Sequence, residues 1–195
     1  MSSTDVGYAD VPGLVSTAGD RGEVTLVVDP ARVVEACTHL RDAGGFNVLV
    51  DVSATDYLGY GEIDVAGHYG TAGGRDLNAA GSQGARRVPD PKPHRFAVSY
   101  HLLRIGADAA RVRVQAWIDD GVELDSVIGV WPGADWYERE IYDLFGIVFR
   151  NHPNLTRILM PDDWSGHPLR KDDAPARVPV TFKGDPGPRV GRVAE

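Results

Sequence analysis

Segments in which apolar residues alternate with polar ones predict the strands of a β-sheet. The clearest alternation lies at 110–118, where valine and alanine alternate with arginine and glutamine. Strand-like runs also occur at 23–28, 46–52 and 94–105. Because the turn Gly106-Ala107-Asp108 separates the last of these from 110–118, we expect the two to form an antiparallel hairpin.

Two other segments repeat apolar residues at the spacing of an α-helix. The first begins at Asp29, a helix N-cap, which is followed by proline at the first helical position. Its inner face carries Val33, Val34, Cys37 and Leu40, and Gly44-Gly45 ends it. The second is expected to run from residue 133 or 134 to residue 144, with Gly146 as its stop signal.

The order of these elements predicts an α+β fold. We expect a small mixed or antiparallel sheet with helices on one face, followed by an extended, proline-rich C-terminal tail. Glycine and proline content divides the chain into a flexible N-terminal arm (1–22), an α+β domain (23–149) and a docking tail (150–195). Within the domain, a Gly/Pro-rich segment at 59–93 is interpreted as an inserted loop.

Charge is unevenly distributed and limits the classes of partner. Residues 1–149 hold 12 Lys and Arg against 22 Asp and Glu, whereas residues 150–195 hold 8 against 6. An acidic body lacks the basic footprint that nonspecific nucleic-acid binding requires, so we expect no nucleic-acid partner. The tail is suited to an acidic partner surface or to the chain's own acidic body.

Cysteine and hydropathy patterns exclude further classes. Cys37 is the single cysteine, so the sequence offers no disulfide framework and no cysteine-ligated metal or iron–sulfur site. No run approaches the roughly 18 apolar residues of a transmembrane helix, and the first residues lack the features of a signal peptide. We therefore expect a cytosolic chain that meets a membrane only through a partner.

The segment 131–171 combines large aromatic residues and charges more densely than any other part of the chain. It contains three of the four tryptophans. An ordinary surface helix places its charges on one face, but here charges and aromatics are interleaved. Charged groups must therefore lie close to surface that avoids water, which is typical of an active site or of an interface with other chains.

Catalysis is the weaker of these two interpretations. On a helix, Glu138 and Glu140 point roughly 200° apart, whereas Glu140 and Asp143 could converge as a carboxylate pair for hydrolysis. The histidines of the chain lack metal-site spacing, and no nucleophile elbow is present. We expect Arg139 to reach Asp143 at i,i+4 in the less favoured orientation.

An interface accounts for more of the segment. Tryptophan, tyrosine and arginine dominate binding hot spots. Charges among them fix the register of an association more than they add affinity. The prolines after residue 150 forbid long regular structure, so the tail is suited to extending over a partner.

The sequence WYEREIYDLFGIVFRNHPNLTRILMPDDWSGHPLRKD, at 136–172, closely resembles the motif region of one protein family. This is the C subunit of NADH-quinone oxidoreductase, the 30 kDa subunit family of respiratory complex I. The segments LVDVSATDYL, RFAVSYHLL and VRVQAWI also resemble strands of that family, so the resemblance covers roughly residues 30–172. The segment 59–93 looks like an insertion relative to the family, and the tail beyond Asp173 is not placed by the match.

The resemblance implies a structural and assembly subunit in the peripheral arm of the proton-pumping complex. Such a subunit carries no cofactor itself, with FMN and iron–sulfur clusters in partner subunits. It packs against the D subunit near the quinone site, close to the B and I subunits, and is peripheral to the cell membrane on its cytoplasmic side. The alternative is the homologous subunit of a related membrane-bound hydrogenase or F420-dehydrogenase complex.

The resemblance also transfers site residues onto this sequence. They are interpreted as interface and assembly residues, with no catalytic, cofactor-binding or metal-binding role: Glu138, Arg139, Glu140, Asp143, His152, Arg157, Trp164, His167, Arg170 and Lys171. Arg157 and Arg170 are the best candidates for buried charge pairs, within this chain or to the D subunit. Gly146 and Gly166 are expected to adopt backbone angles that other residues avoid.

Overall fold

The computed structural model describes residues 8–20, 22–60 and 92–173. The N-terminal residues 1–7, most of the predicted loop 59–93 and the tail beyond 173 lie outside the described residues. In chain order the elements are β1 (Leu14–Asp20), β2 (Glu23–Val28), the 3-10 helix η1 (Pro30–Arg32), α1 (Val33–Asp42), β3 (Val48–Asp56), β4 (Phe96–Arg104), β5 (Ala110–Ile118), β6 (Leu124–Asp125), α2 (Ala134–Phe145) and β7 (Phe149–Arg150).

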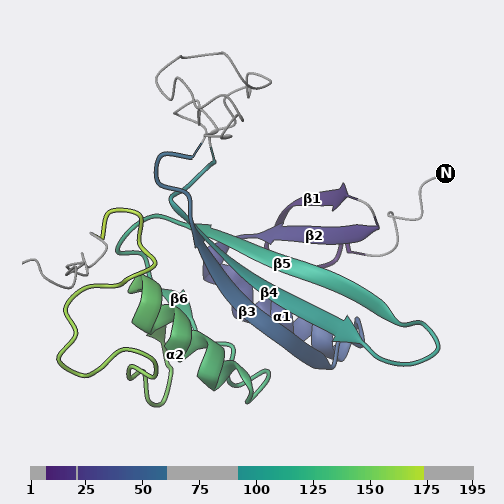
Figure 1. Ribbon diagram of the computed structural model, residues 1–195. Coiled ribbons are helices and arrows are strands. Elements are labelled where there is room, and N and C mark those ends of the chain that lie inside the picture. Colours follow the sequence, from purple (N-terminus) through teal and green to yellow (C-terminus); the bar gives the residue numbers. More distant parts are fainter. Residues whose placement is uncertain (1–7, 21, 61–91, 174–195) are drawn as a thin grey trace, which may run out of the picture.

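A mixed five-stranded sheet in the order β1-β2-β5-β4-β3 forms the centre of the fold (Figure 1). The pair β2 and β5 is parallel, and the other neighbours are antiparallel. The expected hairpin is confirmed, since β4 and β5 pair from Phe96↔Ile118 to Arg104↔Ala110. The α+β class and the mixed sheet are therefore confirmed.

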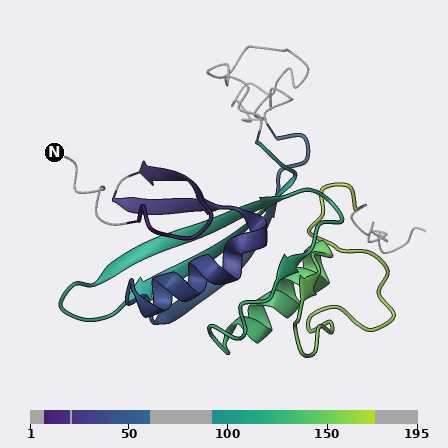
Figure 2. The same cartoon turned by 180° about the vertical axis from the view of Figure 1, so that it is seen from behind.

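Helix α1 covers one face of this sheet (Figure 2). Asp29 caps η1 as predicted, because its Oδ1 accepts the Ala31 N–H at 2.9 Å. The inner face of α1 then buries Val33, Ala36, Cys37 and Leu40. They pack in the same core as Val98 and Val114 of the sheet. The predicted apolar spacing thus becomes the main helix–sheet contact.

Helix α2 runs beside β3, the edge strand of the sheet (Figure 1). The bond from Tyr137 Oη to the carbonyl of Val50, at 3.0 Å, ties the helix to that edge. A free edge strand exposes unpaired backbone groups, and α2 covers part of this one. The helix also carries the charged motif, so the same contact positions the functional residues against the sheet.

Three short elements differ from the sequence prediction. Residues 14–20, which the sequence pattern assigned to the flexible arm, form β1 and pair with β2. The two-residue strands β6 and β7 pair in parallel as a separate small sheet, which the sequence pattern did not predict. The apolar run 127–130 forms turns that lead into α2.

Candidate assembly site on helix α2 and the C-terminal segment

Helix α2 begins where the sequence indicated and ends at Phe145, one residue beyond its predicted end. Asp135 places negative charge in its first turn, where the helix dipole favours it. Gly146 ends the helix in the left-handed conformation, with φ of +75°, and its N–H bonds to the Tyr142 carbonyl. Gly166 also has positive φ, at +90°. Both expectations for these glycines are confirmed.

The chain after β7 folds back on α2, and Asp143 is the main point of attachment. Its buried Oδ2 accepts the N–H groups of Ile158, Leu159 and Met160 at 2.8–3.0 Å. Its Oδ1 lies 3.0 Å from Arg157 Nη1. Burial opposes ionisation of the carboxyl, but these backbone N–H groups and Arg157 outweigh it, so the pKa of Asp143 is lowered.

Arg157 and His167 extend this attachment. Arg157 also donates to the Gly166 carbonyl at 3.1 Å. His167 Nδ1 lies 2.9 Å from the Asp143 carbonyl oxygen, and its backbone N–H donates to Asp173 Oδ2. The buried charge pair predicted for Arg157 is confirmed and lies within this chain. The pair predicted between Arg139 and Asp143 is wrong, because Asp143 is turned inward toward Arg157.

Replacing Gly146 by alanine is expected to lower the free energy of unfolding by about 2–4 kcal/mol. An added Cβ would meet the His167 ring at 2.7 Å, in addition to the roughly 1–2 kcal/mol strain of a left-handed residue. Gly121→Ala is a matched control, because Gly121 has φ of +78° and no atom within 4 Å of its added Cβ. Urea denaturation of both variants checks the prediction, and equal losses would contradict the role given to His167.

A second attachment joins the end of the segment to the sheet. Asp56, buried at the end of β3, pairs with Arg95 at 2.9 Å and accepts the Lys171 N–H at 2.9 Å. Arg95 also contacts Asp172, at 2.6 Å. Burial raises the pKa of Asp56, but hydrogen bonds from Arg95 and from the backbone prevail, so it is lowered overall. The Asp56 carboxylate at the sheet edge therefore binds both the Arg95 side chain and the backbone of Lys171 in the C-terminal segment.

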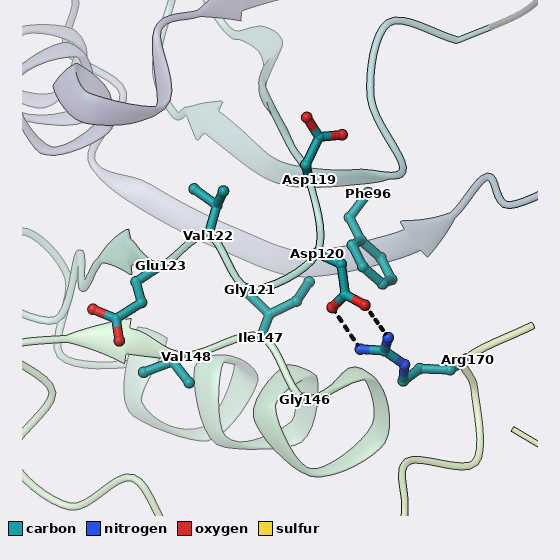
Figure 3. Close-up of a pocket in the computed structure, with 10 residues that line it drawn as sticks. All are labelled: Phe96, Asp119, Asp120, Gly121, Val122, Glu123, Gly146, Ile147, Val148 and Arg170. Atoms are coloured by element: carbon teal, nitrogen blue, oxygen red, sulfur yellow. Dashed lines mark hydrogen bonds and ion pairs between the residues drawn. The ribbon is translucent and has the colours of Figure 1, made fainter. Parts of the chain in front are cut away.

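Arg170 lies beside this cluster and forms a charge pair within the chain, but the pair is not buried as predicted, because the Asp120 side chain is 51% exposed. Its guanidinium pairs with Asp120 and donates to the Phe145 carbonyl at 3.3 Å. Figure 3 shows this pair at the rim of a small pocket that Phe96, Ile147 and neighbouring residues line. The pocket measures about 60 Å³, far below the roughly 300 Å³ at which ligand sites begin.

Glu138 and His152 are buried at the start of α2. Glu138 accepts the Ser126 hydroxyl at 2.5 Å and the Val127 N–H at 2.8 Å. Burial raises the pKa of Glu138 to about 7. His152 Nε2 lies 3.2 Å from Asp135 Oδ1. These side chains join α2 to the segments after β6 and β7.

Other motif residues face outward. Trp136 is 61% exposed and Trp164 is 39% exposed, and Glu140 is exposed. Arg139 stacks over the Trp136 ring at 5.1 Å and donates to the Thr156 carbonyl at 3.1 Å. Within this segment, Asp143 and Arg157 pair with each other inside the chain, whereas the side chains of Trp136 and Trp164 remain accessible to a partner.

The hydrolytic pair considered from the sequence is not assembled. Glu140 is exposed, whereas Asp143 is buried and occupied by Arg157 and three backbone N–H groups. In the described ranges, no group of three or more His, Cys, Asp or Glu side chains is arranged to hold a metal ion. Nor is any helix there long and apolar enough to span a bilayer.

The sequence prediction did not identify most of the side chains of this chain that bind the motif residues. Arg95, Asp120, Asp172 and Asp173 were not assigned a role. Their sequence separation from the motif, such as 115 residues between Asp56 and Lys171, gives no local signal. The charge imbalance between body and tail was the one available indication, since it allowed the tail to bind the chain's own acidic body.

The geometry defines a class: a small α+β protein whose C-terminal segment is fastened to its own domain by buried carboxylates. The family described as respiratory-chain NADH dehydrogenase, 30 Kd subunit, matches residues 26–178. The chain belongs to this family, whose members are subunits of a multi-subunit enzyme complex, complex I.

Individual relatives agree with this assignment. The NADH-quinone oxidoreductase C subunit of Vesicomyosocius okutanii is 38% identical over 174 residues, which cover 88% of this chain and 82% of the relative. The C subunit of Citrifermentans bemidjiense is 42% identical over 168 residues, which cover 84% and 83%. The solved trypsin-resistant fragment of Nqo5 superposes with a TM-score of 0.54 at 32% identity, covering 72% of this chain and 89% of the fragment.

Proposed function

We propose that this chain is a cofactor-free scaffold subunit in the peripheral arm of a proton-pumping NADH:quinone oxidoreductase. In this proposal it packs against the D subunit near the quinone site, with the B and I subunits close by. It is held at the cytoplasmic side of the cell membrane through the complex. The relatives named above are C subunits of NADH-quinone oxidoreductases, which favours this proposal over a hydrogenase or F420-dehydrogenase subunit.

The observation that carries the proposal is the division of the motif into inward charges and outward apolar groups. The charges of Asp143, Arg157 and Arg170 are paired within the chain. The large apolar side chains left accessible in the same region are Trp136, Val148, Leu159, Trp164 and Leu169. Exposed tryptophans are typical of binding hot spots for a protein partner. Because the segment that carries them is already fixed to the domain, docking would cost little conformational entropy.

The residues available support the assignment of cofactors to partner subunits. A single cysteine falls short of the four thiolates of an iron–sulfur cluster. Cys37 is also buried in the core, and burial raises the pKa of its thiol, which disfavours the thiolate that a metal requires. We therefore assign FMN and the clusters to other subunits. The motif residues of this chain then act in the assembly of the complex.

The double variant Trp136→Ala, Trp164→Ala tests the proposal. We expect at least a tenfold loss of the D subunit co-purified with the tagged chain, since hot-spot tryptophans contribute about 2 kcal/mol or more each. Val15→Ala is the control, because Val15 is 68% exposed on β1, away from the motif. Full retention of the D subunit by the double variant, or a stoichiometric flavin or cluster spectrum from the isolated wild-type chain, would contradict the proposal.

A further inference from the structure

Asp135, Glu138 and His152 form a buried cluster that the scaffold function leaves unexplained. The side chains of Glu138 and His152 have no exposed surface, and that of Asp135 is 33% exposed. His152 Nε2 lies 3.2 Å from Asp135 Oδ1 and 4.0 Å from Glu138 Oε2. Neither Nε2 nor Asp135 Oδ1 makes a hydrogen bond in this geometry. Two buried polar atoms thus face one another without a completed bond.

The tautomer of His152 follows from its other ring nitrogen. Nδ1 accepts the backbone N–H of Asn154 at 3.1 Å, so Nδ1 carries no proton while that bond stands. The ring proton of the neutral side chain is therefore on Nε2. Nε2 lies nearer to Asp135 Oδ1, at 3.2 Å, than to Glu138 Oε2, at 4.0 Å, and is hydrogen-bonded to neither in this geometry.

Glu138 has few groups that stabilise a negative charge. Its two donors are the Ser126 hydroxyl and the Val127 N–H. In the part of the chain that the structure describes, His152 is the one basic side chain within 4.0 Å of it. A buried carboxylate without a cation is costly, and Asp135 adds a like charge nearby. The protonated acid is therefore stabilised relative to an ordinary glutamate, in agreement with the raised pKa of Glu138.

Groups from the other packed elements do not relieve this charge. The Cys37 thiol of α1 and the Tyr100 hydroxyl of β4 interact electrostatically with Glu138. Both are buried, and the Tyr100 oxygen has no hydrogen-bond partner. Each would become negative on ionising, so neither balances an ionised Glu138. Asp135, whose side chain is 33% exposed, is the member of the cluster that reaches solvent.

We propose that Asp135, Glu138 and His152 form a proton-binding switch at the junction of α2 with the segments after β6 and β7. When Glu138 holds the proton, the His152 Nε2–H is directed to Asp135. When Glu138 releases it to solvent, the Nε2–H turns to the Glu138 carboxylate and leaves Asp135 free. The switch thus changes the charge and hydrogen bonding of the first turn of α2 without requiring the fold to change.

Side-chain carboxyl and imidazole NMR of the isotopically labelled full chain tests this switch between pH 5.5 and 8.5. We expect the Glu138 carboxyl carbon and the His152 Nε2–H to respond with one shared midpoint near pH 7, while the Asn154 N–H bond persists. Glu138→Gln should abolish the His152 response, and Glu140→Gln, which changes an exposed carboxyl on the same helix, should preserve it.

Asp135→Asn gives a second measurement that does not depend on Glu138→Gln folding. Removing the neighbouring negative charge should move the Glu138 midpoint to lower pH by about half a unit or more. A Glu138 carboxyl that ionises below pH 5.5 in the wild-type chain would overturn the switch. So would a His152 response that survives Glu138→Gln, or a Glu138 midpoint that Asp135→Asn leaves unchanged.

Discussion

Replacing Asp143 by alanine is expected to lower the free energy of unfolding of the full chain by about 3–5 kcal/mol. The change removes one partner of a buried ion pair, a loss of about that size in other proteins. It also leaves the N–H groups of Ile158, Leu159 and Met160 without their acceptor. Urea denaturation followed by tryptophan fluorescence and circular dichroism measures the loss, and Trp164 should report the release of the segment.

Glu140→Ala is the matched control for Asp143→Ala. Glu140 is an acidic residue on the same helix, but its side chain is exposed, so we expect its variant to remain within about 0.5 kcal/mol of wild type. A loss below about 1 kcal/mol for Asp143→Ala would show that its bonds to the segment add little. The segment would then have to be held mainly by Asp56 and Arg170.

The stability of the wild-type chain is expected to fall as the pH rises from about 5 to about 8, because of Glu138. Its folded pKa of about 7 lies above the ordinary glutamate pKa of 4.5. The folded state therefore holds a proton that the unfolded state has lost over this range. A gap of about 2.5 units corresponds to roughly 3 kcal/mol, fully present below the unfolded pKa and lost as the pH passes the folded pKa.

Chemical denaturation at fixed pH values, compared with Glu138→Gln, isolates this contribution. Glutamine cannot ionise, so the difference in unfolding free energy between wild type and variant should change by about 2.5 kcal/mol from pH 5 to pH 8. The carboxyl groups of Asp56, Asp120 and Asp143 have lowered pKa values and act at lower pH. A difference that stays constant across the window would rule out a buried neutral Glu138.

Local signals in the sequence predicted the regular elements well. The bounds of β2 and β5 agree with the alternating runs, and α2 extends to Phe145, one residue beyond its predicted end. Strand β1 was missed because its sequence, LVSTAGD, alternates weakly. It forms because β2 offers it a free edge. Strands β6 and β7 have two residues each and depend on tertiary contacts, which no sequence window contains.

The site was predictable only in part for a similar reason. Helical spacing suggested Arg139 as the partner of Asp143, but tertiary structure supplies Arg157, fourteen residues away, together with three backbone donors. For Arg157 and Arg170 the sequence left open whether their charge pairs lie within the chain or reach the D subunit. The structure shows that Asp143, Arg157 and Arg170 bind groups within the chain, and their contribution to assembly would be to fix the surface around Trp136 and Trp164.

The contact of Lys171 with Asp56 has a consequence for the order of folding. Asp56 faces the segment only when β3 pairs with β4 in the register Asp56↔Phe96. Since side chains alternate between the faces of a strand, a slip by one residue would turn Asp56 to the opposite side. The last described residues to be synthesised can therefore attach only to a correctly paired sheet. Attachment of the segment through Asp56 therefore requires the native register of β3 on β4.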